Sequence, residues 1–339
     1  MSNVGKSLIL LLFSLAAIVL SVGLGTVNIS PETIVNIVFY RFGWAPLGEG
    51  VPANLVAIVW HIRMPRTLMA FSVGAVMGIS GTIMQSLLRN PLASTFTVGV
   101  SAGASLTAAL FIVMGASIPF LGIFALPATG FLGGLAMVLL VLAMSRKMDQ
   151  RLGNQTIILV GMVLSLFANG VLTVITALAR QYLEQLVFWQ MGSFSGSGWA
   201  AVGIMGGTAA IGILFAAAFS KELDIMTFGE EQALSMGVDL QKIKVAFMVT
   251  AAFLTGAAVS FAGIIGFVDL IAPHVVRKLF GSTHKWALPM SALFGGGFMV
   301  LADLAGRTVL SPRELPVGAV TALIGAPFFI YLYSRSRRR

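Results

Sequence analysis

Residues 63–93 read RMPRTLMAFSVGAVMGISGTIMQSLLRNPLA, and this stretch decides the class of fold. Residues 67–88 carry no charged side chain, so they are long enough and apolar enough to cross a membrane as one helix. Three glycines share one face of that helix: Gly74, Gly78 and Gly81. Such a stripe lets a neighbouring helix approach closely. We predict a transmembrane helix that begins beside Pro65 and ends at the polar turn 89–91.

The composition of the whole chain excludes a soluble domain. Of its 339 residues 58% are hydrophobic and 10% are charged, and the mean hydropathy is +0.96. Soluble chains carry about 25% charged residues. The absence of cysteine excludes a disulfide framework, a thiolate metal site and a cysteine nucleophile. Three scattered histidines do not suggest a zinc cluster, so we predict no metal site.

Nine segments are long enough and apolar enough to span a bilayer core of about 30 Å as helices. They are 8–27, 67–88, 97–114, 120–144, 156–178, 199–219, 245–265, 288–304 and 316–333. None shows the period-two alternation of a membrane β-strand. The first has no clear small-residue cleavage site, so we interpret it as an uncleaved anchor helix. The predicted fold class is an all-α polytopic membrane protein.

A tenth stretch, 266–280, is short and polar, and the distribution of basic residues decides whether it crosses. If it crosses and the N-terminus is cytoplasmic, 15 of the 21 Lys and Arg residues lie inside and the remaining 6 lie outside. If it does not cross, the split becomes 10 inside to 11 outside. The positive-inside rule favours the first arrangement. We therefore predict ten transmembrane helices with both termini cytoplasmic, in a single permease domain over 1–339.

This arrangement assigns each long loop to one side of the membrane. Residues 28–62 and 179–198 face outward, and the helical spacing of apolar residues within 31–42 predicts a helix along the outer interface. The largest inward loop is 220–243, and the basic tail 335–339 is expected to anchor the last helix to anionic headgroups.

The sequence lacks the chemistry of an enzyme. It has no glycine-rich phosphate loop and no nucleophile–base constellation, so ATP is not bound through a P-loop. Asp269 and Asp303 are the only candidate intramembrane acids, and we place both at hydrated outer ends of helices. A lone histidine such as His274 is expected to be structural. The chain is therefore interpreted as a conduit.

The inward loop contains a short amphipathic segment bounded by glycines. Its residues are Gly229, Glu230, Glu231, Ala233, Leu234, Met236 and Gly237. This segment could lie on the membrane surface or be bound by another protein. Interfacial helices usually present Lys and Arg to anionic lipid, so the two acidic residues favour a protein partner.

Arg63 and Arg66, at the outer mouth of the second predicted helix, leave two interpretations open. They could extend to lipid phosphates, or they could bind carboxylates of a docking partner.

Five stretches together resemble the FecCD family of permeases, the membrane subunits of bacterial ABC importers for iron–siderophores, haem and vitamin B12. They are the stretch quoted above, TVGVSAGA, GEEQALSMGV, LIAPHVVR and ELPVGAVTALIGAPFF. The resemblance implies a homodimer or a pair of paralogues in the bacterial cytoplasmic (inner) membrane, two separate ATPase chains below and a substrate-binding protein above. It implies no cofactor in this chain, because ATP and Mg²⁺ belong to the ATPase, and it implies no nucleic-acid partner.

The resemblance also implies roles for particular residues. Gly229–Gly237 matches the helix that couples the permease to its ATPase. Arg63, Arg66 and Arg307 match arginines that dock the binding protein, and Asn154 lies where a gate residue is expected. Asp269 and Met236 depart from the family pattern, which usually has a small residue and a leucine at these places.

The substrate stays open at this stage. A ferric siderophore is the commonest substrate in the resembling family, with haem and cobalamin as alternatives. An ion-coupled secondary transporter is an alternative of another class, and it would need buried carboxylates and broken helices.

Overall fold

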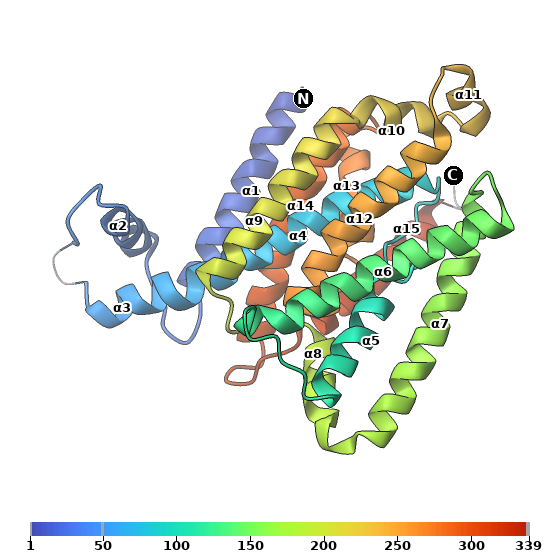
Figure 1. The fold of residues 1–339 in the computed structure, drawn as a ribbon. Helices are drawn as coiled ribbons and strands as arrows, with labels where there is room; N and C mark the ends of the chain where they lie inside the picture. The colour runs from blue at the N-terminus through green and yellow to red at the C-terminus, as the bar shows by residue number, and fades with distance from the viewer. Residues whose placement is uncertain (1, 49–50, 337–339) are drawn as a thin grey trace.

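A computed structural model describes residues 2–48 and 51–336, and within these ranges the regular elements are all helices (Figure 1). In chain order the first half contains α1 (Asn3–Gly23), α2 (Pro31–Arg41), α3 (Ala53–Ala57), η1 (Ile58–Arg63), α4 (Met64–Leu87), α5 (Val100–Val113), η2 (Gly122–Phe124), α6 (Ala125–Met148) and α7 (Asn154–Leu178). The second half contains η3 (Arg180–Tyr182), α8 (Leu183–Met191), α9 (Trp199–Ala218), α10 (Ser220–Thr227), α11 (Glu230–Ser235), α12 (Leu240–Ala262), α13 (Val268–Phe280), α14 (His284–Thr308) and α15 (Val317–Ser336).

Helix α4 is the centre of the bundle and packs against α9, α12, α13 and α14 (Figure 1). The predicted glycine stripe explains how closely these helices approach. A Cβ at Gly74 or Gly78 would collide with the carbonyls of Gly295 or Ser291 on α14. A Cβ at Gly81 would collide with the carbonyl of Asp269 on α13. The prediction that these glycines permit close packing is therefore confirmed.

The helix that contains the decisive stretch begins earlier than predicted. It runs without a break from Ala53 to Leu87, and η1 forms a π-helical turn within it. Pro65 follows this turn, where the amide of Met64 donates to the carbonyl of Val59. Proline has no N–H and its ring clashes with the carbonyl four residues before it, so a wider turn accommodates it inside a helix. The prediction that the helix starts at Pro65 is therefore wrong.

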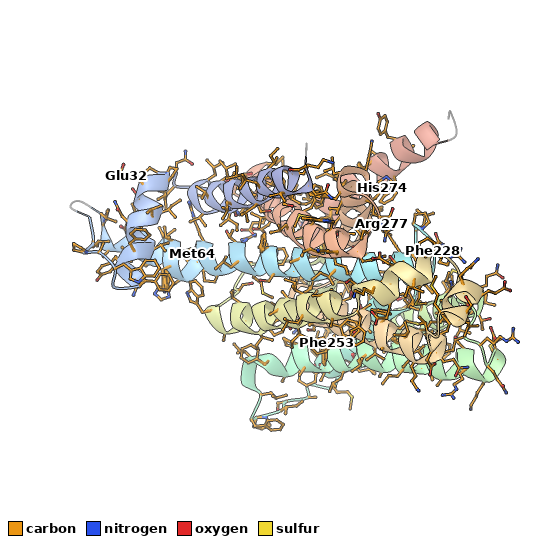
Figure 2. The ribbon with its side chains drawn as sticks, turned by 90° about the horizontal axis from the view of Figure 1, so that it is seen from above. Glu32, Met64, Phe228, Phe253, His274 and Arg277 are labelled. Carbon is orange, nitrogen blue, oxygen red and sulfur yellow. The ribbon has the colours of Figure 1, made fainter. Side chains whose placement is uncertain are left out.

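The bundle has two distinct ends. The N-terminus, α10 and α11 lie at one end, whereas α2 and α3 project from the other (Figure 1). Figure 2 shows the same division, with Phe228, His274 and Arg277 towards the first end and Glu32 and Met64 towards the second. We call them the α11 end and the α2 end. The basic-residue count predicts that the α11 end is cytoplasmic.

Aromatic side chains gather at the α2 end, as expected at a membrane interface. The rings of Phe39 and Phe42 contact Trp44, and the ring of Trp60 lies 4.7 Å from that of Trp199, centroid to centroid. The indole of Trp199 donates to the Trp60 carbonyl at 2.9 Å. The predicted outer helix within 31–42 corresponds to α2, whereas α8 in the loop 179–198 was not expected.

Helices α5 and α13 are short because the chain enters the bundle before each of them. Gly99 and Phe267, which precede them, have φ of 89° and 70°. Irregular backbone at membrane depth must be buried in protein and hydrogen-bonded. Before α5 this need is met within the chain, because the amide of Phe96 donates to the Ser94 hydroxyl at 3.1 Å and that of Gly99 donates to the Phe96 carbonyl at 3.0 Å.

Each of the ten predicted crossings coincides with a helix, and seven helices in the described ranges meet length and apolarity criteria for a span. Two more apolar helices are shorter, Val100–Val113 and Val317–Tyr331. The all-α polytopic fold class is confirmed. The count of ten is compatible with the structure and stays a prediction. Residues 337–339 of the basic tail lie outside the described residues.

Candidate functional site

The segment predicted to couple the chain to an ATPase forms an exposed corner at the α11 end. Gly229 and Gly237 flank it with φ of 128° and 82°, which non-glycine residues rarely adopt. Ala233 is fully buried, so one side of α11 packs onto the bundle. Leu234 is 58% exposed and Met236 is 62% exposed. The segment therefore presents apolar side chains to whatever lies beyond this end.

The two acidic residues of α11 have different surroundings. The Glu230 carboxylate accepts a hydrogen bond from the ammonium of Lys244 at 2.7 Å, and the Lys244 side chain is fully buried. Lys244 also donates to the carbonyl of Leu152 at 2.8 Å. Glu231 is exposed and forms no ion pair within the described ranges. Of these two acidic residues, Glu230 is the one that forms an ion pair with the bundle within the described ranges.

The predicted gate residue Asn154 is the first residue of α7 and follows a tight turn. Its side-chain amide donates to the Leu87 carbonyl at 3.3 Å, and its Oδ1 atom is buried without a hydrogen bond. In the turn, the Asp149 carboxylate accepts from the amides of Arg151 at 2.9 Å and Gly153 at 2.7 Å. These backbone hydrogen bonds hold the pKa of Asp149 below its usual value. Asn154 thus sits between a structured turn and the end of α4.

Helix α10 is tied to the bundle by a second polar network. Asp224 accepts from the backbone amide of His284 at 2.9 Å and lies 2.6 Å from its Nδ1 atom. The other ring nitrogen, Nε2, is hydrogen-bonded to Ser86 on α4 at 2.5 Å. Arg277 on α13 donates to both Ser86 and Gln85 at 2.9 Å. This network joins α10 to α4, α13 and α14.

The three arginines predicted to dock a binding protein lie together at the α2 end, but Arg63 is turned inward. It is 6% exposed, and its guanidinium donates to the carbonyls of Val22 and Gly23 at 2.8 and 3.0 Å and to that of Val27 at 2.6 Å. These carbonyls end α1 and begin the next loop, so Arg63 caps a helix C-terminus. A docking role for Arg63 stays a prediction, and it would require this cap to open.

Arg66 and Arg307 flank one buried carboxylate. Arg66 donates to Asp303 at 2.9 to 3.1 Å and to Glu314 at 2.8 and 3.0 Å. Arg307 lies 3.7 Å from Asp303 and donates to the Leu24 carbonyl at 3.1 Å. The hydrogen bonds from Arg66 hold the pKa of Glu314 below its usual value. Two arginines and two acids therefore form one closed cluster.

Both intramembrane acids are buried, which corrects the prediction that they occupy hydrated positions. The Asp303 side chain is 1% exposed and pairs with Arg66. Asp269 is 0% exposed, lies against Gly81 and accepts a hydrogen bond from Ser94. Its second oxygen has no hydrogen-bond partner among the described residues. The prediction was wrong because hydropathy could not show that α13 begins inside the bundle.

Helix α7 lies at one edge of the chain, against α5 and α6 (Figure 1). Its outer face carries large exposed apolar residues, and Leu166 is 73% exposed. Beside it is a cavity of about 750 Å³. Polar side chains that line this cavity are Asn169, Thr173, Thr176, Arg180 and Gln190. Leu172, Ala177 and Leu183 also line it, so the hollow is of mixed character.

Sequence reasoning missed Lys244, although a signal was present. Leu240, Lys244, Phe247 and Ala251 follow each other at spacings of four, three and four residues, and all are buried. This helical period places Lys244 on the apolar face of α12. Asp224 and His284 had no such signal, since 60 residues separate them. Within the described ranges no group of three or more potential metal ligands occurs.

The bundle of long apolar helices defines the class as a multi-pass membrane protein. The profile of the FecCD transport family matches residues 10–335, so the chain belongs to that family. It is therefore an ABC importer permease of the cytoplasmic membrane, in a family that serves metal chelates, haem and vitamin B12.

Known proteins that resemble the chain agree with this membership. It is 36% identical to the Fe(3+)-citrate import system permease protein YfmD of Bacillus subtilis, over 97% of this chain and 96% of that one. It is 35% identical to the hemin transport system permease protein HmuU of Yersinia pestis, over 83% and 85%. A solved ABC transporter assigned to the metal-chelate type, in an inward-facing conformation, superimposes with a TM-score of 0.83 at 28% identity, covering 96% and 97%.

Proposed function

We propose that the chain translocates an iron chelate, with a ferric siderophore as the substrate, and that a separate ATPase drives it through α11. The observation that carries the coupling is the exposed apolar corner of Leu234 and Met236 between two glycines of positive φ. ATP and Mg²⁺ would bind the ATPase, and this chain would supply the moving helices.

The translocation path is proposed to run along α7 between two copies of the chain. Asn169, Thr173 and Gln190 border the cavity beside α7, and such polar groups are costly in contact with lipid. A second copy would cover the apolar part of this face and leave the cavity between the subunits. A path with few charges would hold the substrate weakly, so affinity would reside in a binding protein docked at the α2 end.

The substrate proposal is supported by the similarity to Fe(3+)-citrate permeases, but other relatives are named for hemin and cobalamin. Haem and vitamin B12 are therefore the alternatives within the family. Uptake of a radiolabelled ferric siderophore, haem and cobalamin into proteoliposomes that hold the complete transporter would choose among them.

The alternative of an ion-coupled secondary transporter is not retained. Family membership assigns the chain to ABC permeases. In addition, Asp303 is paired with arginine, so it is not a free carrier of a proton or sodium ion.

The coupling proposal predicts that Leu234→Glu lowers ATP-driven uptake about tenfold, because a charge would face an apolar contact at the ATPase. The permease should still fold, since this side chain is 58% exposed. Uptake and ATP hydrolysis are measured together in proteoliposomes. Lys242→Gln, at an exposed residue outside Gly229–Gly237, is the control and should keep most of the uptake. Equal uptake in the Leu234→Glu variant and the parent would remove α11 from the proposal.

The docking proposal makes a prediction about Glu314. If Arg66 binds a carboxylate of the binding protein, its ion pair with Glu314 must first break. Glu314→Gln should therefore tighten docking by about threefold at low salt, and less at high salt because of screening. Surface capture of the binding protein measures this. Unchanged affinity at every salt concentration would leave Arg66 with a structural role only.

A further inference from the structure

Lys244 holds two separate elements at the α11 end. Its ammonium lies 2.7 Å from the Glu230 carboxylate of α11 and 2.8 Å from the Leu152 carbonyl, in the turn before α7. The lysine side chain is 0% exposed, whereas that of Glu230 is 34% exposed. The lysine thus connects the proposed ATPase contact to the segment that precedes the proposed gate.

The Glu230–Lys244 contact resists separation. A buried ammonium is stable only while it is paired and hydrogen-bonded, and removing its counter-ion leaves an uncompensated charge. A displacement of α11 that carries Glu230 away would leave Lys244 in that state. We expect Lys244 to move with Glu230. Because Lys244 also donates to the Leu152 carbonyl, its movement would pull on that carbonyl.

Hydrogen bonds hold the turn 149–153 together, so a movement of Leu152 would displace the whole turn. Asp149 accepts from two amides within the turn, and Leu152 has a φ of 52° and is buried. Gln241, one helical turn before Lys244, donates to the Gln150 carbonyl at 2.7 Å. Asn154 begins α7 directly after the turn. Residues 149–153 and the start of α7 would therefore move as one piece.

We propose that Lys244 is a positioning residue that transmits the displacement of α11, through Glu230, to turn 149–153 and the start of α7. The Asp224–His284 network is separate from this route, because it starts from α10 and joins α4, α13 and α14. The inference rests on the proposed function in one respect, namely that ATP binding to the partner moves α11.

The chain has no cysteine, so single spin labels can report on each part of this route. Ser235→Cys reports on α11 and Gln150→Cys reports on the turn. Each label is placed in the reconstituted permease–ATPase complex, and its spectrum is compared without nucleotide and with ATP plus vanadate. The variants are Glu230→Gln, whose side chain is 34% exposed, and Lys244→Met, with Lys242→Met, at an exposed lysine of the same helix, as the matched control.

In the parent and in the Lys242→Met control, ATP should change the spectra at both positions. In Glu230→Gln and Lys244→Met, the change at position 150 should fall about fivefold while that at position 235 persists. An undiminished change at 150 in Glu230→Gln, with 235 responding, would overturn the role of Lys244 and leave the proposed function intact. The same would follow if Lys242→Met reduced the change at 150 equally.

A parent complex in which position 235 does not respond to ATP would overturn the proposed function, and the inference with it. If Lys244→Met does not fold, Glu230→Gln still decides the question, because it leaves the lysine in place and removes only the charge on α11.

Discussion

Asp303 and the arginines beside it show how this chain accommodates charge inside a helical bundle. Asp303 is buried, yet it accepts from Arg66 and lies 3.7 Å from Arg307. Each partner compensates the cost of removing the other from water. The three side chains come from α4 and α14, so the cluster also fixes how these helices meet.

Removing the central carboxylate should therefore be costly. Asp303→Ala is expected to lower the free energy of unfolding by about 3 kcal/mol, because two guanidinium groups lose a buried partner. Denaturant titration of the detergent-solubilised protein measures this. Glu314→Gln, at a residue whose side chain is 45% exposed, is the control and should cost about 1 kcal/mol or less. Similar losses for both would show that the cluster does not depend on its buried member.

The close packing of the helices depends on glycines, which have no side chain. At Gly78 the backbones of α4 and α14 are so close that a Cβ would overlap the Ser291 carbonyl. Close backbone approach is how transmembrane helices gain packing where no hydrophobic effect drives them together. Gly206 on α9 has no heavy atom within 4 Å of the position a Cβ would take.

These two glycines should respond differently to the same substitution. Gly78→Leu is expected to cost more than about 3 kcal/mol or to abolish folding, because α4 and α14 would have to separate. Gly206→Leu should be tolerated. Folded yield by size-exclusion chromatography and thermal unfolding in detergent measure both. A folded Gly78→Leu variant of parental stability would contradict the packing seen here.

The arrangement of the whole molecule predicts which residues are accessible from each side of the membrane. The N-terminus and α12 start at the α11 end, and the connection between α5 and α6 lies at the other. In the cysteine-free chain, Lys242→Cys and Val4→Cys should react with a membrane-impermeant thiol reagent only from the cytoplasmic side. Phe120→Cys should react only from outside. Val4 and Lys242 labelled from opposite sides would contradict the ten-crossing arrangement.

The sequence by itself determined the fold class, because nearly uncharged segments of about 20 residues have no stable place outside a membrane. It also predicted the glycine stripe on α4 and the glycine-bounded α11, since both depend on local spacing and backbone conformation. The periodicity of α12 also places Lys244 on a buried face.

Only the tertiary structure decided which charges are free and which are paired. Arg63 and Arg66 look alike in the sequence, but one caps α1 and the other binds two acids from distant parts of the chain. Likewise, Glu230 and Glu231 are neighbours, yet only Glu230 meets Lys244. The energy of a charged group depends on the partners and the burial that the fold brings to it, and no local pattern of residues encodes these.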